Sequence, residues 1–240
     1  MVGNLEKNTI YNIDCNEAVE LLDAFGGGGE VLQNFCIVTD PPYNVGYHYE
    51  DYDDNMEEGA YYSMLSRIIG KRPAVILHYP EALHKLSIAI GKAPDRVVSW
   101  VYNSNTGRQH RDIAFYGVKP DFSKVPQPYK NATDRRIMER IAAGKFCKMY
   151  DWFVEDQIKN VYKEKMKIDH PCVIPLAVMD KIVRLLPENL TIIDPFCGTG
   201  TTCIAAKKNG RDFIGMERSS KYFALAKRRL NEETAQTSLF

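Results

Sequence analysis

Residues 193–202 read IDPFCGTGTT, and this stretch decides the fold that the sequence predicts. It follows a short apolar run at 191–193 and leads into a helical pattern at 202–208, with Gly210 as the expected helix stop. Glycines allow a tight turn and a close approach of the backbone to a ligand, and a helix N-terminus offers free N–H groups. The stretch therefore predicts a cofactor loop at the carboxyl end of a strand in an α/β protein.

Short runs rich in β-branched residues alternate with helical patterns on either side of this loop, which predicts an α/β fold with a mostly parallel sheet and helices on both faces. The expected strands are 9–13, 35–39, 74–77, 97–101, 113–116, 191–193 and 212–216. The expected helices include 16–25, 133–143, 178–186, 202–208 and a last helix capped by Ser219. The stretch 103–169 breaks the alternation and is interpreted as an insert beside the sheet.

The composition is that of a soluble globular chain, with 45% hydrophobic and 26% charged residues. No apolar run approaches the roughly 20 residues that span a bilayer, and no signal-peptide pattern begins the sequence. A cytoplasmic protein without a membrane partner is therefore expected. The six cysteines lack C-x-x-C spacing, which favours neither a zinc ribbon nor a disulfide framework, and no metal is expected.

The net charge of zero conceals a local imbalance. Residues 101–150 carry ten Lys or Arg against four acids, whereas 40–60 carry seven acids and neither Lys nor Arg. A basic region can bind phosphates while the whole chain stays neutral. A solvated surface is the alternative interpretation of such a charge run.

A second motif, Asp40-Pro41-Pro42-Tyr43, follows the apolar strand expected at 35–39. Prolines fix the backbone angle φ, so the carbonyl of Pro41 can be aimed rigidly. This carbonyl and the Asp40 carboxylate are two hydrogen-bond acceptors, which match the two donors of an amino group, and Tyr43 supplies a flat face for stacking. A simple surface turn would more often use Gly or Asn.

The strand expected at 212–216 ends at Glu217, which is placed to accept hydrogen bonds from two ribose hydroxyls. A surface acid that caps a helix is the alternative for Glu217. The glycine spacing of the cofactor loop is not G-x-G-x-x-G and no P-loop lysine follows it, which disfavours a dinucleotide or ATP site.

Together the two motifs resemble those of the amino-methylating DNA methyltransferases, which modify N6 of adenine or N4 of cytosine. The DPPY tetrapeptide at 40–43 is similar to the catalytic motif of that family, and DPFCGTG at 194–200 is similar to its cofactor loop. The motif order resembles the β-type arrangement, a circular permutation of the usual one. The resemblance implies a Rossmann-like class I methyltransferase fold with a catalytic part at 1–102, a small basic target-recognition insert at 103–169 and a cofactor-binding part at 170–240.

The resemblance implies S-adenosyl-L-methionine as the cofactor and double-stranded DNA as the partner. It assigns catalysis to Asp40, Pro41, Pro42 and Tyr43. It assigns cofactor binding to Asp14, Cys15, His170, Pro171, Asp194, Phe196, Gly198, Thr199, Gly200, Thr201 and Glu217. Phosphate contacts are expected from Lys130, Arg135, Arg136 and Arg140, and contacts with base edges from Arg108 and Arg111. Homodimers are common in the family, but no segment identifies an interface.

The expected activity is site-specific methyl transfer to the exocyclic amine of a flipped base, in a restriction–modification setting. Asp40 favours N6 of adenine, whereas a serine there would have favoured N4 of cytosine. RNA and a protein amide also present an NH2 group and stay open as substrates. A catalytically silent nucleic-acid-binding module is the alternative from another class, and the intact Asp40 and glycine loop argue against it. The position of Cys172 in the motif order disfavours methylation at C5 of cytosine.

Overall fold

The computed structural model describes residues 5–25, 34–49, 52–70, 72–158, 170 and 172–237. Its main strands are β1 (Thr9–Tyr11), β2 (Phe35–Thr39), β5 (Ala74–His78), β6 (Arg96–Val101), β7 (His110–Tyr116), β10 (Trp152–Val154), β11 (Thr191–Asp194) and β12 (Phe213–Met216). Shorter strands are β3 (His48–Tyr49), β4 (Tyr52–Asp53), β8 (Pro126–Gln127) and β9 (Cys147–Lys148). The helices in these ranges are α1 (Cys15–Phe25), α2 (Glu58–Ile69), α3 (Pro80–Ile90), α4 (Arg135–Ala142), α6 (Leu176–Leu185), α7 (Thr201–Lys208) and α8 (Ser220–Thr237), with a 3-10 helix at Phe122–Lys124.

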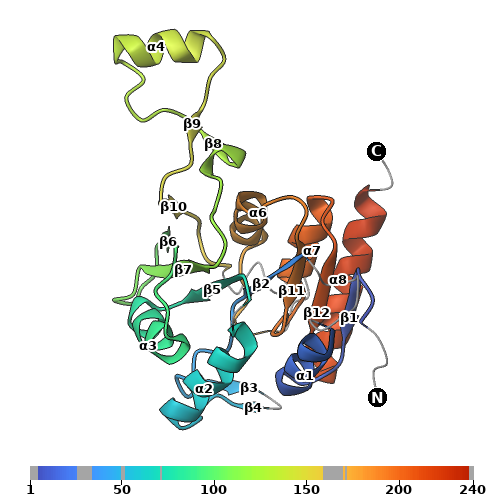
Figure 1. Cartoon of the computed structure of the whole chain (residues 1–240). Helices are drawn as coiled ribbons and strands as arrows, with labels where there is room; N and C mark the ends of the chain where they lie inside the picture. Colours follow the sequence, from blue (N-terminus) through green and yellow to red (C-terminus); the bar gives the residue numbers. More distant parts are fainter. Residues whose placement is uncertain are drawn as a thin grey trace.

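The main strands form one sheet in the order β1-β12-β11-β2-β5-β7-β6-β10. β7 pairs antiparallel with β5 and β6, and the other pairings are parallel. Helices α1, α2 and α3 cover one face of the sheet, and α6, α7 and α8 cover the other (Figure 1). The predicted strands are all present, and the predicted α/β fold with a mostly parallel sheet is confirmed.

The alternation of side chains along the central strands explains why both faces are covered. In β5, Val75 and Leu77 belong to one apolar cluster, whereas Ala74 and Ile76 belong to the other. β2 and β7 alternate between the same two clusters. Strands that are apolar on both faces are typical of a sheet buried between two layers of helices.

Two segments of the stretch 103–169 are strands of the main sheet, namely β7, which was predicted at 113–116, and β10, which was not predicted. β7 is paired along both of its edges, and β10 extends the sheet beyond β6. The prediction of β7 at 113–116 missed only its polar start, which consists of His110, Arg111 and Asp112. The part that stands away from the body is residues 126–148, which contain β8, α4 and β9 and which we call the arm (Figure 1).

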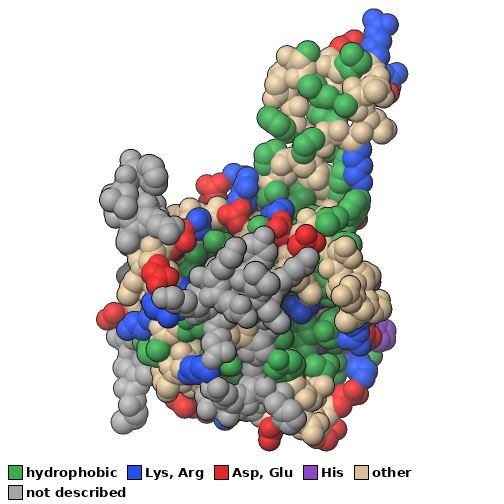
Figure 2. Space-filling model, turned by 180° about the vertical axis from the view of Figure 1, so that it is seen from behind, with side chains coloured by type: hydrophobic (Ala, Val, Ile, Leu, Met, Phe, Trp, Pro, Cys, Tyr) green, Lys and Arg blue, Asp and Glu red, His purple; other side chains and the backbone are tan. Residues whose placement is uncertain are grey.

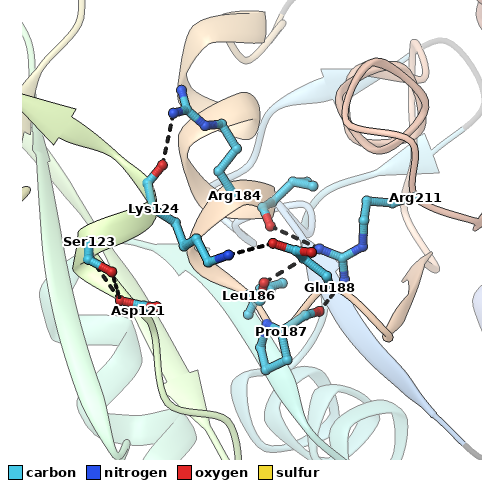
Figure 3. Close-up of polar contacts among 9 residues, drawn as sticks. Asp121, Ser123, Lys124, Arg184, Leu186, Pro187, Glu188 and Arg211 are labelled. Atoms are coloured by element: carbon cyan, nitrogen blue, oxygen red, sulfur yellow. Dashed lines mark hydrogen bonds and ion pairs between the residues drawn. The ribbon is translucent and has the colours of Figure 1, made fainter.

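Polar contacts fasten the base of the arm to the C-terminal end of α6 (Figure 3). Arg184 donates a hydrogen bond to the carbonyl of Lys124 at 2.8 Å, and the Lys124 ammonium lies 2.5 Å from the Glu188 carboxylate. The guanidinium of Arg211 donates to carbonyls that follow the helix, among them that of Leu190 at 2.8 Å. The same guanidinium lies 3.5 Å from the carbonyl of Leu186, the C-cap of α6, which is an acceptor of the kind that a helix C-terminus leaves unpaired.

Helix α8 packs directly against the predicted cofactor loop. Gly200 has φ +80°, and a Cβ placed on it would lie 3.1 Å from the Cβ of Ala226. The buried Arg229 on the same helix donates to the carbonyl of Thr199 at 2.5 Å and to the hydroxyl of Thr201 at 3.2 Å. The shape of the loop therefore depends on α8 as well as on its own glycines.

Within the described ranges, no helix combines the length and the apolar character needed to cross a membrane. The same ranges contain no group of three or more His, Cys, Asp or Glu side chains arranged to hold a metal ion.

Replacement of Gly200 by alanine is expected to lower the free energy of unfolding by about 2–3 kcal/mol. About 1–2 kcal/mol comes from the left-handed backbone and roughly 1 kcal/mol from crowding against Ala226. Gly210→Ala is the matched control, because Gly210 has φ +65° and open space around it. Urea unfolding measures both variants, and equal losses would contradict close packing as the reason for Gly200.

Candidate active site

A cavity of about 430 Å³ lies at the edge of the sheet where β1, β2, β11 and β12 have their carboxyl ends. Parallel strands bring the segments that follow them to one edge, so residues far apart in the sequence meet there. The volume is within the roughly 300–1,000 Å³ of protein ligand pockets. Of the predicted catalytic and cofactor-binding residues, those that line the cavity are Asp14, Cys15, Asp40, Pro41, Pro42, Tyr43, His170, Asp194, Phe196, Gly198, Thr199, Thr201 and Glu217.

The two remaining predicted cofactor-binding residues are Gly200 and Pro171. Gly200 is not part of the cavity wall, because it faces Ala226 of α8. Its lack of a side chain is therefore explained by packing. Pro171 lies outside the described residues.

Glu217 is held rigidly at the end of β12. One carboxylate oxygen accepts a hydrogen bond from the N–H of Gly198 at 2.9 Å, and the other accepts one from Ser219 at 2.7 Å. Burial raises the pKa of Glu217, although these two N–H groups lower it. Each carboxylate oxygen has more than one lone pair, so Glu217 keeps acceptor capacity toward the cavity.

Asp194 joins the two predicted motifs. Its Oδ1 accepts a hydrogen bond from the hydroxyl of Thr39 at 2.7 Å and another from the N–H of Phe196 at 3.0 Å. Thr39 directly precedes Asp40, so the two loops are fixed relative to each other. Burial raises the pKa of Asp194 to about 6, against the lowering by its hydrogen-bond donors.

Asp40 is engaged by two side chains of this protein. Its Oδ1 accepts a hydrogen bond from the Tyr43 hydroxyl, and its Oδ2 lies 3.9 Å from the guanidinium of Arg111. Burial raises the pKa of Asp40 above its ordinary value, whereas the charge of Arg111 and the bond from Tyr43 lower it. Burial and the nearby carboxylate raise the pKa of Tyr43, so this hydroxyl keeps its proton and acts as the donor.

Arg111 occupies a place that the sequence analysis did not predict. The prediction grouped it with DNA-contacting surface residues, but its side chain is only 12% exposed and lies in the cavity wall beside Asp40. Its guanidinium carbon is 5.0 Å from the ring centre of Tyr43 and 5.4 Å from that of Trp100. Arg111 is therefore a cation of the cavity wall, next to the tetrapeptide.

Two further residues of the site were missed, His78 and Tyr79. They follow the apolar run at 74–77, so the same strand-end rule that singled out Asp40 would have found them. The His78 ring stacks on the Tyr43 ring with centres 4.3 Å apart and planes at 17°. Tyr79 lines the cavity and meets Tyr43 edge-on at 4.7 Å.

The loop after the tetrapeptide forms the β3–β4 hairpin beside the cavity. The buried Asp54 carboxylate accepts hydrogen bonds from the N–H groups of Asn44 at 2.7 Å and Val45 at 3.1 Å. Val45 and Tyr47 line the cavity and are also exposed to solvent. One acid of the acidic stretch 40–60 therefore has a structural role inside this hairpin.

Four of the predicted phosphate contacts lie far from the cavity. Lys130, Arg135, Arg136 and Arg140 are all on the arm. The arm leaves the sheet after β7, whose antiparallel direction brings the chain to the amino ends of the parallel strands. Figure 1 accordingly shows α4 at the opposite end of the molecule from β3 and β4. These cations and the cavity therefore lie toward opposite ends of the parallel strands.

Arg108, in contrast, lies beside the cavity. Its guanidinium carbon is 3.9 Å from the ring centre of Tyr79, and it pairs with Glu81 at 2.6 Å. The loop 103–109 that carries it follows β6 at the carboxyl edge of the sheet.

The sequence model of the DNA methylase family N6_N4_Mtase matches residues 80–228, more than half of the chain. The chain belongs to this family. It is an S-adenosylmethionine-dependent DNA methyltransferase of the N6/N4 type. The match begins after the tetrapeptide at 40–43, so that motif adds evidence from outside the matched region.

Individual proteins agree with the family assignment. The type II methyltransferase M.HpaI of Haemophilus parainfluenzae is 25% identical over 224 residues, which are 82% of this chain and 68% of that protein. The crystal structure of the M1.HpyAVI–SAM complex has a TM-score of 0.57 at 20% identity and covers 92% of this chain and 98% of that one. The cytosine-N4-specific PvuII DNA methyltransferase has a TM-score of 0.63 at 15% identity and covers 97% of this chain and 92% of that one. At these identities the two structures establish the fold of the methyltransferase.

Proposed function

We propose that this methyltransferase transfers the methyl group to N6 of adenine in a specific DNA sequence. The observation that carries the proposal is the arrangement of Asp40, Pro41 and Tyr43 on the wall of one cavity with the glycine loop. An aspartate at position 40 favours adenine within the family. Methylation at N4 of cytosine is the rival activity, which the fold of the PvuII enzyme keeps open.

In the proposed mechanism, Asp40 and the Pro41 carbonyl accept hydrogen bonds from the two N–H groups of the base. The amino nitrogen is a poor nucleophile while its lone pair is delocalised into the ring, and these acceptors favour a localised lone pair. They also stabilise the partial positive charge that forms on the nitrogen during attack. Acceptors placed in advance contribute about 3 kcal/mol to the transition state. Tyr43 offers its ring to the flipped base, where stacking contributes about 1–3 kcal/mol.

The remaining cavity residues are proposed to hold the cofactor. S-adenosylmethionine, when bound, supplies an electrophilic methyl group on its sulfonium. The cavity fits this group, because a rigid carboxylate at the end of β12 faces the same space as the glycine turn and the start of α7. Glu217 would bind the ribose hydroxyls, and Asp14, Cys15, His170 and Phe196 would line the site. Asp194 would act by holding the loop, since its Oδ1 is taken up by Thr39 and Phe196.

Nucleoside mass spectrometry of unmethylated DNA incubated with the protein and S-adenosylmethionine tests the proposal. N6-methyladenine is expected, and sequencing of the modified positions then gives the recognition sequence. Asp40→Ala is expected to keep cofactor binding and to lose at least about a hundredfold in methyl transfer, because it removes one preplaced acceptor. N4-methylcytosine would overturn the choice of base, and full activity of Asp40→Ala would overturn the role of the carboxylate.

The charge of Arg111 is expected to set the acidic limit of activity. The proposed mechanism needs Asp40 ionised, and burial opposes ionisation while Arg111 favours it. In the Arg111→Met variant the pKa of Asp40 therefore rises, and activity is lost at a higher pH on acidification. The expected displacement is about one to two pH units, the usual effect of an adjacent opposite charge.

The measurement is kcat/KM for methyl transfer from pH 5 to 9. Arg111→Lys should restore part of the wild-type profile, because it keeps the charge. Arg108→Met is the matched control, since Arg108 is exposed, pairs with Glu81 and is not a cause of the Asp40 shift. An acidic limb that stays in place in Arg111→Met would contradict the assignment.

We also propose that the target-recognition role expected for 103–169 belongs to its segments beside the cavity, including the loop 103–109. Arg108 lies at the cavity rim, whereas the cations of α4 lie at the other end of the molecule. Figure 2 shows the arm projecting from the body with apolar and basic side chains on its surface. Its exposed large hydrophobic residues are Met138, Ile141 and Phe146.

We expect Arg108 at the cavity rim to meet a phosphate in place of the base edge that the sequence suggested. Arg108→Ala should therefore weaken DNA binding and reduce the slope of log K against log salt by about 0.9, the loss of one phosphate contact. In dilute protein, the wild-type slope should be kept by the triple variant Arg135→Ala, Arg136→Ala, Arg140→Ala, because these three cations lie on α4, away from the cavity. Fluorescence anisotropy with a labelled duplex measures both. A reduced slope in the triple variant would return α4 to the DNA interface.

A further inference from the structure

Beneath the tetrapeptide lies a chain of three hydrogen bonds that the proposed chemistry does not use. The N–H of Tyr79 donates to Nδ1 of His78 at 2.8 Å, and Nε2 of His78 lies 2.9 Å from the hydroxyl of Tyr61. That hydroxyl donates to the carbonyl of Pro42 at 2.7 Å. His78 and Tyr61 are each 1% exposed, so both are shielded from water.

The direction of every bond in this chain follows from its first donor. A backbone N–H can only donate, so Nδ1 of His78 is the unprotonated nitrogen and Nε2 carries the ring proton. Nε2 therefore donates to the Tyr61 oxygen, and the Tyr61 proton is directed at Pro42. Burial and the charges of Arg111 and Arg108 lower the pKa of His78 to about 3, so the ring stays neutral across the range in which enzymes work. The chain of hydrogen bonds is therefore a fixed support and carries no mobile proton.

His78 supports the motif in a second way. Its ring lies parallel to the ring of Tyr43, with centres 4.3 Å apart and planes at 17°. One side chain at the end of β5 therefore contacts the Tyr43 ring directly and reaches the Pro42 carbonyl through Tyr61. These are the two parts of the tetrapeptide that follow Asp40 and Pro41.

We propose that His78 and Tyr61 are positioning residues, which fix the Pro42 carbonyl and the plane of the Tyr43 ring so that the acceptors of Asp40 and Pro41 face the amino group of the target base. This inference rests on the proposed amino methylation and assigns residues to its support. Neither side chain is a cavity-lining residue, so neither contacts the substrate. A shift of the acceptors by about 1 Å can cost a hundredfold in rate, which makes such a support consequential.

Tyr61→Phe is the first test, because it removes one oxygen and keeps the ring that packs in the core. The expected result is a fall in kcat of about tenfold or more, with KM for S-adenosylmethionine within about twofold of wild type. The matched control is Tyr116→Phe, which removes a hydroxyl that pairs with Ser87 at 3.1 Å from an equally buried tyrosine outside the site. This control should keep kcat within about twofold of wild type.

A double variant separates positioning from general stability. His78→Phe keeps a flat ring under Tyr43 but breaks the same chain of hydrogen bonds as Tyr61→Phe. If the chain acts as a unit, the double variant loses little more kcat than the worse single variant, since coupled residues are non-additive. The proposal would be overturned if the fold-losses in kcat of the two single variants multiplied in the double variant, or if Tyr61→Phe left kcat unchanged.

Nitrogen-15 NMR of the histidine rings gives a readout that needs no activity. The structure requires one ring protonated at Nε2 alone, without titration between pH 5 and 9, and this signal should vanish in His78→Phe. A His78 ring that titrates near its ordinary pKa would overturn the inference. N4-methylcytosine as the wild-type product would refute only the choice of adenine, because the amino chemistry is shared. The kcat values of the variants relative to wild type would still test the positioning role of His78 and Tyr61. Absence of any methylated DNA would overturn both proposals and leave the NMR result as a statement about the fold.

Discussion

The hydroxyl of Thr39 donates a 2.7 Å hydrogen bond to Asp194, and this contact joins the last residue of β2 to the last residue of β11. The two strands are parallel neighbours, so the loops that follow them leave the sheet side by side. The relative placement of the two motifs depends on this registration, since one loop carries the tetrapeptide and the other the glycine turn. The bond is made in a dry environment, where burial raises the pKa of Asp194 to about 6. A polar contact in such a place is costly to break, because the buried carboxylate would lose one of its few donors.

Support from outside the loops is as important as the loops themselves. α8 holds the glycine turn through Ala226 and Arg229, while α2 and the end of β5 hold the tetrapeptide through Tyr61 and His78. The two halves of the cavity are thus braced from opposite faces of the sheet, which the two apolar clusters bury separately. Main-chain groups that face a ligand need such support. Without it, the loop would lose conformational entropy each time a ligand bound and ordered it, and the affinity would fall.

The sequence predicted what is local and missed what tertiary packing decides. The tetrapeptide and the glycine turn were found because both follow apolar strands directly, and the strand-end rule needs only local pattern. The place of Arg111 in the cavity wall was not predicted, because the first residues of β7 are polar and nothing in the sequence shows that an antiparallel strand carries them to the cavity. The same antiparallel strand turns the arm to the opposite end of the sheet from the cavity, which basic composition alone could not show. Tyr61 could not be predicted, because it lies on a helix and enters the site only through the packing of α2 on β5.

The crowding around Asp40 explains why a carboxylate suits this position. One oxygen already accepts the Tyr43 hydroxyl, and the other faces the Arg111 guanidinium. A carboxylate has about four acceptor sites on its two oxygens, so it can receive an amino N–H without releasing either neighbour. An asparagine would turn one oxygen into a donor that faces a cation, and a serine would offer a single oxygen. In a site where an arginine and a tyrosine are both built into the wall, a carboxylate satisfies both neighbours and keeps acceptor capacity toward the cavity.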